Sequence, residues 1–264
     1  MASHGLQIKN VDSGEASINY YVAGDGPAIC LLASTGRSGG DFKELAHELV
    51  RRGYKVILPE PRGIGGSTGP MAGLDFHDLA TDVSATIKAE TDNAVVAGHA
   101  FGCWIARTVA ADYPELIRGL ALIAAGSGQW PAELPQAIDC LASSDATRQQ
   151  RIDALKLAFF AEGNDPESWL EGWHADVIAM QRAARAKTDK ASWWHSGNAP
   201  ILDVIALQDP FRPEQSRNNF VEEFGERVTI DTIDGASHAL PDEKPLEVAQ
   251  CLARWIATLE TVKI

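Results

Sequence analysis

The fold is decided by the stretch Val95-Val96-Ala97-Gly98-His99-Ala100-Phe101-Gly102, which runs directly into Cys103-Trp104-Ile105-Ala106-Arg107-Thr108-Val109. The apolar residues at its start are typical of a strand that is buried on both faces of a parallel sheet. The residues after the second glycine are typical of a helix. Because Gly98 and Gly102 can adopt backbone conformations closed to other residues, the sequence predicts a sharp strand-to-helix turn with Ala100 at its tip.

The spacing of this turn is that of the G-x-S-x-G pattern. In that pattern the strained central residue holds a nucleophilic serine above the sheet, over the N-terminus of the helix. Here the central residue is Ala100, and its methyl group has no nucleophilic atom. Cys103 is the nearest thiol, but it lies three residues further on, nearly one helical turn away, and we interpret it as a small buried residue.

Apolar runs and amphipathic segments alternate on both sides of the turn. Strands are predicted at 16–23, 28–33, 55–59, 95–97, 119–125, 200–207 and 228–233, the first antiparallel and the last a half-exposed edge. Helices are predicted at 41–52, 74–90, 213–224 and 245–259, besides the one that follows the turn. Since strands alternate with helices and crossovers are right-handed, the sequence predicts an α/β fold with a mostly parallel, doubly wound sheet.

The composition changes between residues 127 and 198, where only helical pieces at 149–162 and 175–187 stand out between prolines. We predict that this segment is an inserted helical cap and that residues 1–126 and 199–264 form the core domain. The insertion carries five candidate substrate-binding residues: Trp130, Trp169, Trp173, Trp193 and Trp194. These tryptophans either hold the cap to the core or line an apolar pocket over the turn.

Composition narrows the classes of partner. The chain has 264 residues and a net charge of −13, whereas nucleic acids and anionic membranes require clustered Lys and Arg. We therefore expect a small, uncharged or apolar partner.

No basic leader with an apolar run and no membrane-length apolar segment is seen, which predicts a cytoplasmic protein. Four cysteines without metal-ligand spacing indicate reduced thiols and no metal site.

Two polar residues follow late strands: Asp209 comes just after 200–207, and His238 lies in the loop after 228–233. Because loops at the carboxyl ends of parallel strands share one edge of the sheet, both residues can converge on Ala100. The chain order of turn, acid and histidine, with a cap between two strands, resembles the α/β-hydrolase superfamily over nearly the whole chain.

The resemblance implies a role for each of these residues. Ala100 occupies the nucleophile position, Asp209 orients and stabilises the imidazole, and His238 is the general base. The Phe101 N–H and an N–H of the loop at Thr35 form the oxyanion hole. Ser34 contributes polar lining, where the family usually has His-Gly and this chain has Ala33-Ser34. His99, beside the turn, packs against it or supports it. No cofactor is implied.

Three functions are compatible with these residues. The first is a cofactor-independent serine-type hydrolase of an ester or lactone bond in an apolar, aromatic small molecule, present here in a Ser-to-Ala state. The second is a naturally serine-free lyase, oxygenase or decarboxylase that uses His238 as its base. The third is a ligand-binding pseudoenzyme. The retained acid and base favour the first, because a pure binding protein has no chemical use for them.

Overall fold

A computed structural model describes residues 5–128 and 130–261. Its centre is an eight-stranded sheet in the order β1-β2-β4-β3-β5-β6-β7-β8. The strands are β1 (Gln7–Ser13), β2 (Ala16–Ala23), β3 (Ala28–Leu32), β4 (Lys55–Pro59), β5 (Ala94–His99), β6 (Ile117–Ile123), β7 (Ile201–Ala206) and β8 (Val228–Ile233). β1, β2 and β4 pair antiparallel, whereas all pairs from β4 to β8 are parallel. The predicted α/β fold class is confirmed.

The strand β1 was not predicted from the sequence. Its residues Gln-Ile-Lys-Asn-Val-Asp-Ser are mostly polar and exposed, because it forms the outer edge of the sheet and pairs only with β2. Its apolar residues Ile8 and Val11 neither alternate with polar ones nor form a run, so the stretch carries no strand pattern. At the opposite edge lies β8, half-exposed as predicted.

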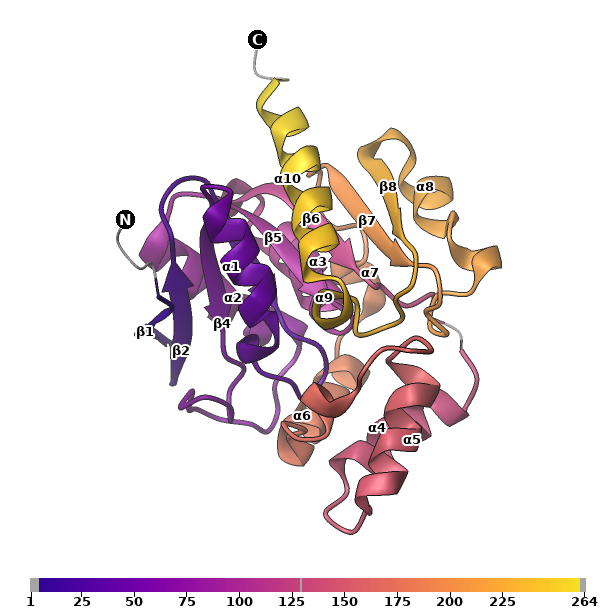
Figure 1. Cartoon of the computed structure of the whole chain (residues 1–264). Coiled ribbons are helices and arrows are strands. Elements are labelled where there is room, and N and C mark those ends of the chain that lie inside the picture. Colours follow the sequence, from indigo (N-terminus) through magenta and orange to yellow (C-terminus); the bar gives the residue numbers. More distant parts are fainter. Residues whose placement is uncertain (1–4, 129, 262–264) are drawn as a thin grey trace.

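Helices cover both faces of the sheet. The helices α1 (Lys43–Arg51) and α10 (Pro245–Thr261) pack on one face, and α2 (Phe76–Glu90) and α3 (Gly102–Asp112) on the other (Figure 1). Side chains of β5 alternate between the two cores: Val96 joins that of α2 and α3, and Val95 that of α1 and α10. The strand that enters the turn is therefore buried on both faces, as its apolar run predicts.

Three predicted helices begin later than expected, among them α1, which follows a 3₁₀ turn at Gly39–Phe42. The helix α2 begins at Phe76, because Asp75 caps it and forms a capping box with Asp78. In the segment 213–224 only α8 (Asn219–Phe224) is α-helical, after a single 3₁₀ turn at Glu214–Ser216. A further short helix, α9 (Leu240–Glu243), follows the loop that carries His238.

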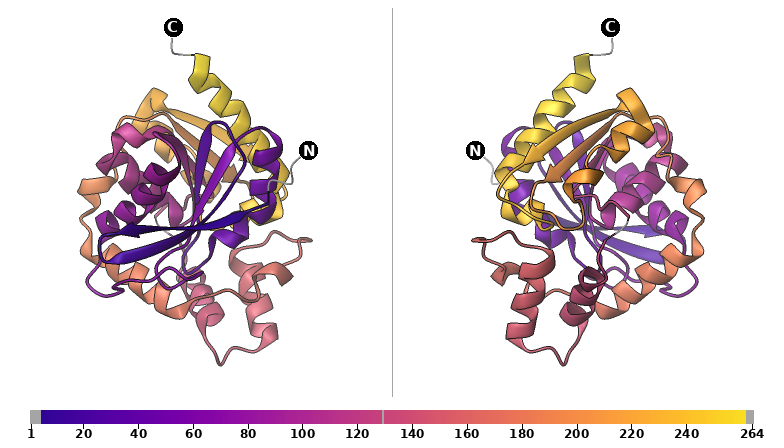
Figure 2. Two further views of the ribbon diagram at one scale, coloured as in Figure 1. Left: turned by 90° about the vertical axis from the view of Figure 1, so that its left-hand side faces the viewer. Right: turned by 90° about the vertical axis from the view of Figure 1, so that its right-hand side faces the viewer.

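The insertion between β6 and β7 consists of helices. They are α4 (Glu133–Ala142), α5 (Arg148–Ala158), α6 (Ala175–Lys187) and α7 (Lys190–Trp193). The helices α4 and α5 form a hairpin that projects beyond the sheet (Figures 1 and 2), whereas α7 packs against α3 of the main body. The helix α4 was not predicted from the sequence, because it contains Pro135, one of the prolines that separate the predicted helical pieces. This proline lies in the first turn of the helix, where a missing N–H leaves no hydrogen bond unmade.

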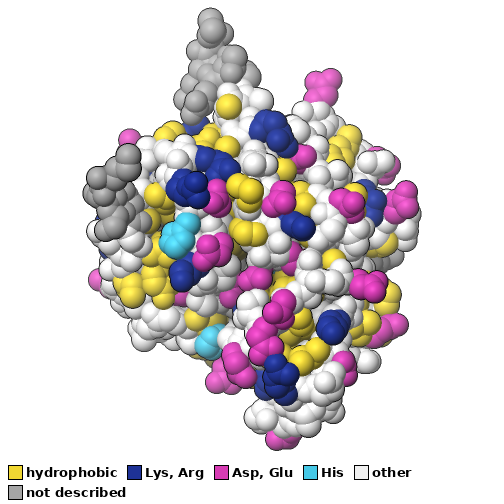
Figure 3. Space-filling model, viewed as in Figure 1, with side chains coloured by type: hydrophobic (Ala, Val, Ile, Leu, Met, Phe, Trp, Pro, Cys, Tyr) yellow, Lys and Arg dark blue, Asp and Glu magenta, His cyan; other side chains and the backbone are white. Residues whose placement is uncertain are grey.

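Charged side chains of both signs are interspersed over the face drawn in Figure 3. Within residues 5–128 and 130–261, no helix is both long and apolar enough to cross a membrane.

Candidate active site

The turn between β5 and α3 has the geometry that its glycines predict. Ala100 has a φ of 50°, in the left-handed region that residues other than glycine rarely adopt. A Cβ atom on Gly98 would lie 2.3 Å from the backbone of Gly102, and one on Gly102 would lie 2.2 Å from the Leu32 carbonyl oxygen. Only glycine fits at either position. Ala100 is thus held in a strained conformation at the carboxyl edge of the sheet.

The structure brings Asp209 and His238 together beside this turn. The His238 Nδ1 lies 2.8 Å from Asp209 Oδ2, and the other carboxylate oxygen accepts the Phe211 N–H at 2.8 Å. A carboxylate only accepts hydrogen bonds, so Nδ1 carries the proton and Nε2 is left as the basic atom. Both residues are buried, and the Phe211 ring lies 4.2 Å from the imidazole, centroid to centroid. The pair has the geometry of a general base with its orienting acid.

His99 supports this pair through a hydrogen bond to the backbone of His238. Its Nε2 donates to the backbone carbonyl of His238 at 2.6 Å, and its side chain is buried. Burial, and secondarily the proximity of His238, lowers the pKa of His99 to about 3. The ring is therefore neutral, and it fixes the backbone of the loop that carries the base.

The loop after β3 supplies the residues expected at the oxyanion hole. Within the described residues, neither the Phe101 N–H nor the Thr35 N–H has a hydrogen-bond partner. The loop is tied to the cap by Gln181, whose Oε1 accepts the Thr35 hydroxyl at 2.9 Å and the Gly36 N–H at 2.8 Å. Sequence analysis missed Gln181. Its signal was a polar residue within the apolar stripe of α6, between Ile178 and Ala184.

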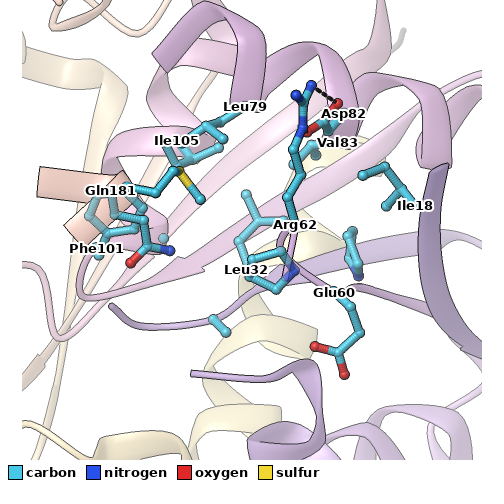
Figure 4. A pocket seen from close by; sticks show the side chains of 15 residues that line it. Ile18, Leu32, Glu60, Arg62, Leu79, Asp82, Val83, Phe101, Ile105 and Gln181 are labelled. Atoms are coloured by element: carbon cyan, nitrogen blue, oxygen red, sulfur yellow. Dashed lines mark hydrogen bonds and ion pairs between the residues drawn. The ribbon is translucent and has the colours of Figure 1, made fainter. Parts of the chain in front are cut away.

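A second anchor holds the other end of this loop. The Glu60 carboxylate accepts the Ser38 hydroxyl at 2.6 Å and the Gly39 N–H at 3.2 Å, and burial raises its pKa. Figure 4 shows Glu60 beside a small cavity of about 60 Å³, with Phe101 and Gln181 on its other side. Both anchors thus reach the loop from buried positions.

A larger cavity of about 170 Å³ opens over the turn. Ser34, Thr35, Ala100, Phe101 and His238 all line it, so the residues predicted for the site meet at one place. Its other lining residues are Trp104, Gly126, Trp130, Pro135, Ile138, Phe159, Gln181, Arg182, Arg185 and Phe211. The cavity combines apolar walls with a few polar groups, as small-molecule sites commonly do.

Of the five predicted tryptophans, Trp130 lines this cavity and the other four lie elsewhere. Trp169 and Trp173 stack on the Arg37 guanidinium, 4.5 and 4.9 Å from their ring centroids, so they hold the cap to the loop after β3.

Trp193 packs against Phe76 and Trp104, and Trp194 covers the Arg107 guanidinium. The interpretation that tryptophans staple the insertion to the core thus describes these four. Besides Trp130, the aromatic residues that line the cavity are Phe101, Trp104, Phe159 and Phe211.

Cys103 is buried against the sheet. Its Sγ lies 3.0 Å from the Gly98 carbonyl oxygen, and burial raises its pKa to about 12. A thiol with such a pKa is not ionised at neutral pH and is a poor nucleophile. In the part of the chain that the structure describes, no cluster of three or more His, Cys, Asp or Glu side chains is arranged to hold a metal ion.

Comparison with known proteins agrees with this geometry. The sequence model of the alpha/beta hydrolase family matches residues 31–251. The chain is 29% identical over 189 residues to the 2-(acetamidomethylene)succinate hydrolase of Mesorhizobium japonicum, covering 71% of this chain and 63% of that protein. It is 34% identical over 248 residues to human Protein ABHD8, covering 86% of this chain and 54% of that protein. The chain thus spans between about half and two thirds of the length of these relatives.

Solved structures with the same fold include a bacterial membrane phospholipase A, with a TM-score of 0.79, 20% identity, and coverage of 97% of this chain and 87% of that one. A thermophilic esterase from Thermogutta terrifontis has a TM-score of 0.79 and 18% identity, and covers 96% of this chain and 99% of that one. The turn at Ala100, the Asp209–His238 pair and the family match lead to one conclusion: the chain belongs to the alpha/beta hydrolase family.

Proposed function

We propose that this site hydrolyses the ester or lactone bond of a largely apolar small molecule through a serine at position 100, and that the chain with Ala100 is its inactive form. The observation that carries the proposal is the Asp209–His238 pair, joined at 2.8 Å and lining one cavity with the strained residue 100. Every part of a serine hydrolase is supported by a residue here except the nucleophilic oxygen.

The expected chemistry follows from these positions. The Oγ of a serine at position 100 adds to the substrate carbonyl carbon while its proton passes to Nε2 of His238. The N–H groups of Phe101 and Thr35 donate to the oxyanion. The alcohol then leaves with the proton from His238, and water repeats the sequence on the acyl-enzyme to release the acid and restore the serine.

Relatives and the cavity support the type of bond and substrate. The relatives include a protein named as a lipase, from a Moraxella strain. The aromatic walls formed by Trp104, Trp130, Phe159 and Phe211 suit an apolar substrate. Cys103 offers no replacement nucleophile, because burial keeps its thiol protonated.

A second candidate is favoured by the same retained base. In it, alanine is the natural residue at position 100. His238 removes a proton from the substrate or from water, and no covalent intermediate forms. This reaction needs His238 and Asp209 but gains nothing from a serine at position 100.

The substitution Ala100→Ser separates the two candidates. With p-nitrophenyl acetate and butyrate, we expect Ala100→Ser to raise kcat/KM by several orders of magnitude, since loss of a triad nucleophile costs about 10⁶-fold in turnover. The double variant Ala100→Ser/His238→Ala is the matched control and should return to background. Its melting temperature shows whether it is folded. An unchanged rate in folded Ala100→Ser would refute the serine proposal.

A further inference from the structure

The ionisable side chains that line the main cavity are all basic. They are Arg182, Arg185 and His238, and among residues 5–128 and 130–261 no Asp or Glu lines it. This contrasts with the chain as a whole, which has 36 acidic and 23 basic side chains and a net charge of −13. Since Asp139 pairs with Arg182 and Asp209 pairs with His238, Arg185 is the basic residue of this lining that no carboxylate of the described residues pairs.

Arg185 differs from Arg182, the other arginine that lines the cavity. Arg182 is paired with Asp139, its Nη1 lying 2.6 Å from Oδ1. Arg185 makes no hydrogen bond or ion pair with any residue in the described part of the chain. Its guanidinium carbon lies 4.4 Å from the centroid of the Trp104 ring, and partial burial lowers its pKa. Stacking holds the guanidinium plane and leaves its N–H groups available to an acceptor.

The position of Arg185 relates it to the reaction centre. It lies one helical turn after Gln181, the residue that binds the Thr35 loop, so the two Cα atoms are about 6 Å apart along the helix axis. Residues four apart share a helix face, and both side chains line the cavity. An anionic group at Arg185 and a carbonyl group at the oxyanion loop can thus be bound in the same cavity.

We infer that the substrate carries a carboxylate at the end remote from the bond that is cleaved, and that Arg185 binds this carboxylate. The inference rests on the proposed function, and it deepens it: the substrate becomes an ester that also carries a free carboxylate. The planar guanidinium of Arg185 can donate two parallel hydrogen bonds to such a carboxylate.

Equilibrium binding to the Ala100 chain tests the inference without turnover. Isothermal titration calorimetry compares monomethyl adipate, which has a free carboxylate, with dimethyl adipate, which has the same chain and no charge. Because the Arg185 side chain is exposed to solvent, we expect the half-ester to bind up to about fivefold more tightly, as an exposed ion pair implies. Arg185→Leu should abolish this preference, and Arg185→Lys should keep part of it, because lysine retains the charge but not the fork.

Arg148→Leu is the matched control, since Arg148 pairs with Glu167 on the surface and does not line the cavity. It should keep the full preference. Equal binding of the two esters, an unchanged preference in Arg185→Leu, or no saturable binding of the half-esters of succinate, glutarate and adipate would each overturn the inference. A folded Ala100→Ser protein without esterase activity but with the half-ester preference would refute the proposed function and leave the carboxylate site standing.

Discussion

Lowering the pH is expected to destabilise this protein through His99. The ring is buried beneath the active-site loop, and its pKa is lowered to about 3 by burial and by the proximity of His238 and Arg37. In the unfolded chain the pKa of a histidine is about 6.5. Between these two values the unfolded state binds a proton that the folded state does not, so the free energy of unfolding falls as the pH falls from neutrality toward 3.

The size of the effect follows from the two pKa values. At pH 5 the unfolded histidine is almost fully protonated and the folded one is neutral, which lowers the free energy of unfolding by about 2 kcal/mol relative to pH 7.5. Other buried groups such as Glu60, whose pKa is raised, change stability in the opposite direction as they titrate. The contribution of His99 must therefore be isolated by a variant.

His99→Gln isolates it, because the glutamine side-chain amide can still donate to the His238 carbonyl but does not titrate. Urea unfolding followed by the fluorescence of the seven tryptophans gives the free energy of unfolding of both proteins at each pH. At pH 7.5 the difference between the two free energies of unfolding is the cost of packing glutamine in place of histidine. We expect that difference to shift by about 2 kcal/mol in favour of His99→Gln at pH 5. A difference that is the same at both pH values would refute the argument.

Three further predictions concern residues that position the site. Gly98→Ala should prevent folding or lower the free energy of unfolding by more than about 3 kcal/mol, because its Cβ would lie 2.3 Å from backbone atoms. The control Gly5→Ala places its Cβ in open space and should change the urea midpoint little. Asp203→Ala should lower the free energy of unfolding by about 3–5 kcal/mol in the same assay, because it leaves the buried Arg212, its partner at 2.8 Å, without a counter-charge. The more exposed pair of Arg254 and Asp231 is the control, and Asp231→Ala should lower it by less than about 1 kcal/mol. In an Ala100→Ser background with esterase activity, Gln181→Leu should lower kcat about ten- to a hundredfold with a smaller change in KM, because it frees the Thr35 loop. Gln181→Glu should restore part of the rate, because its carboxylate accepts the same hydrogen bonds. Equal losses in both variants would contradict this role.

The order and type of the main elements could be predicted because they depend on local chemistry. Apolar runs such as 28–33 and 200–207 can be satisfied only between two helical layers, and Gly98 and Gly102 permit a turn that other residues exclude. The sites of Asp209 and His238 followed from topology, since the carboxyl ends of parallel strands share one edge. Elements without such a local signal, the polar edge strand β1 and the proline-containing helix α4, could not be recognised in this way.

The sequence by itself determined the layered fold, the strained turn at Ala100 and the acid–base pair that faces it. Tertiary structure alone decided what surrounds that pair, because lining a cavity depends on contacts between residues far apart in the chain. Four of the five tryptophans chosen for their apolar character hold the insertion to the core, while Trp104, Phe159 and Phe211 line the cavity with Trp130. Net charge describes the whole chain and does not show the local charge of one cavity. That Arg185 lines the cavity without an ion-pair partner among the described residues depends on which side chains α6 turns toward the site.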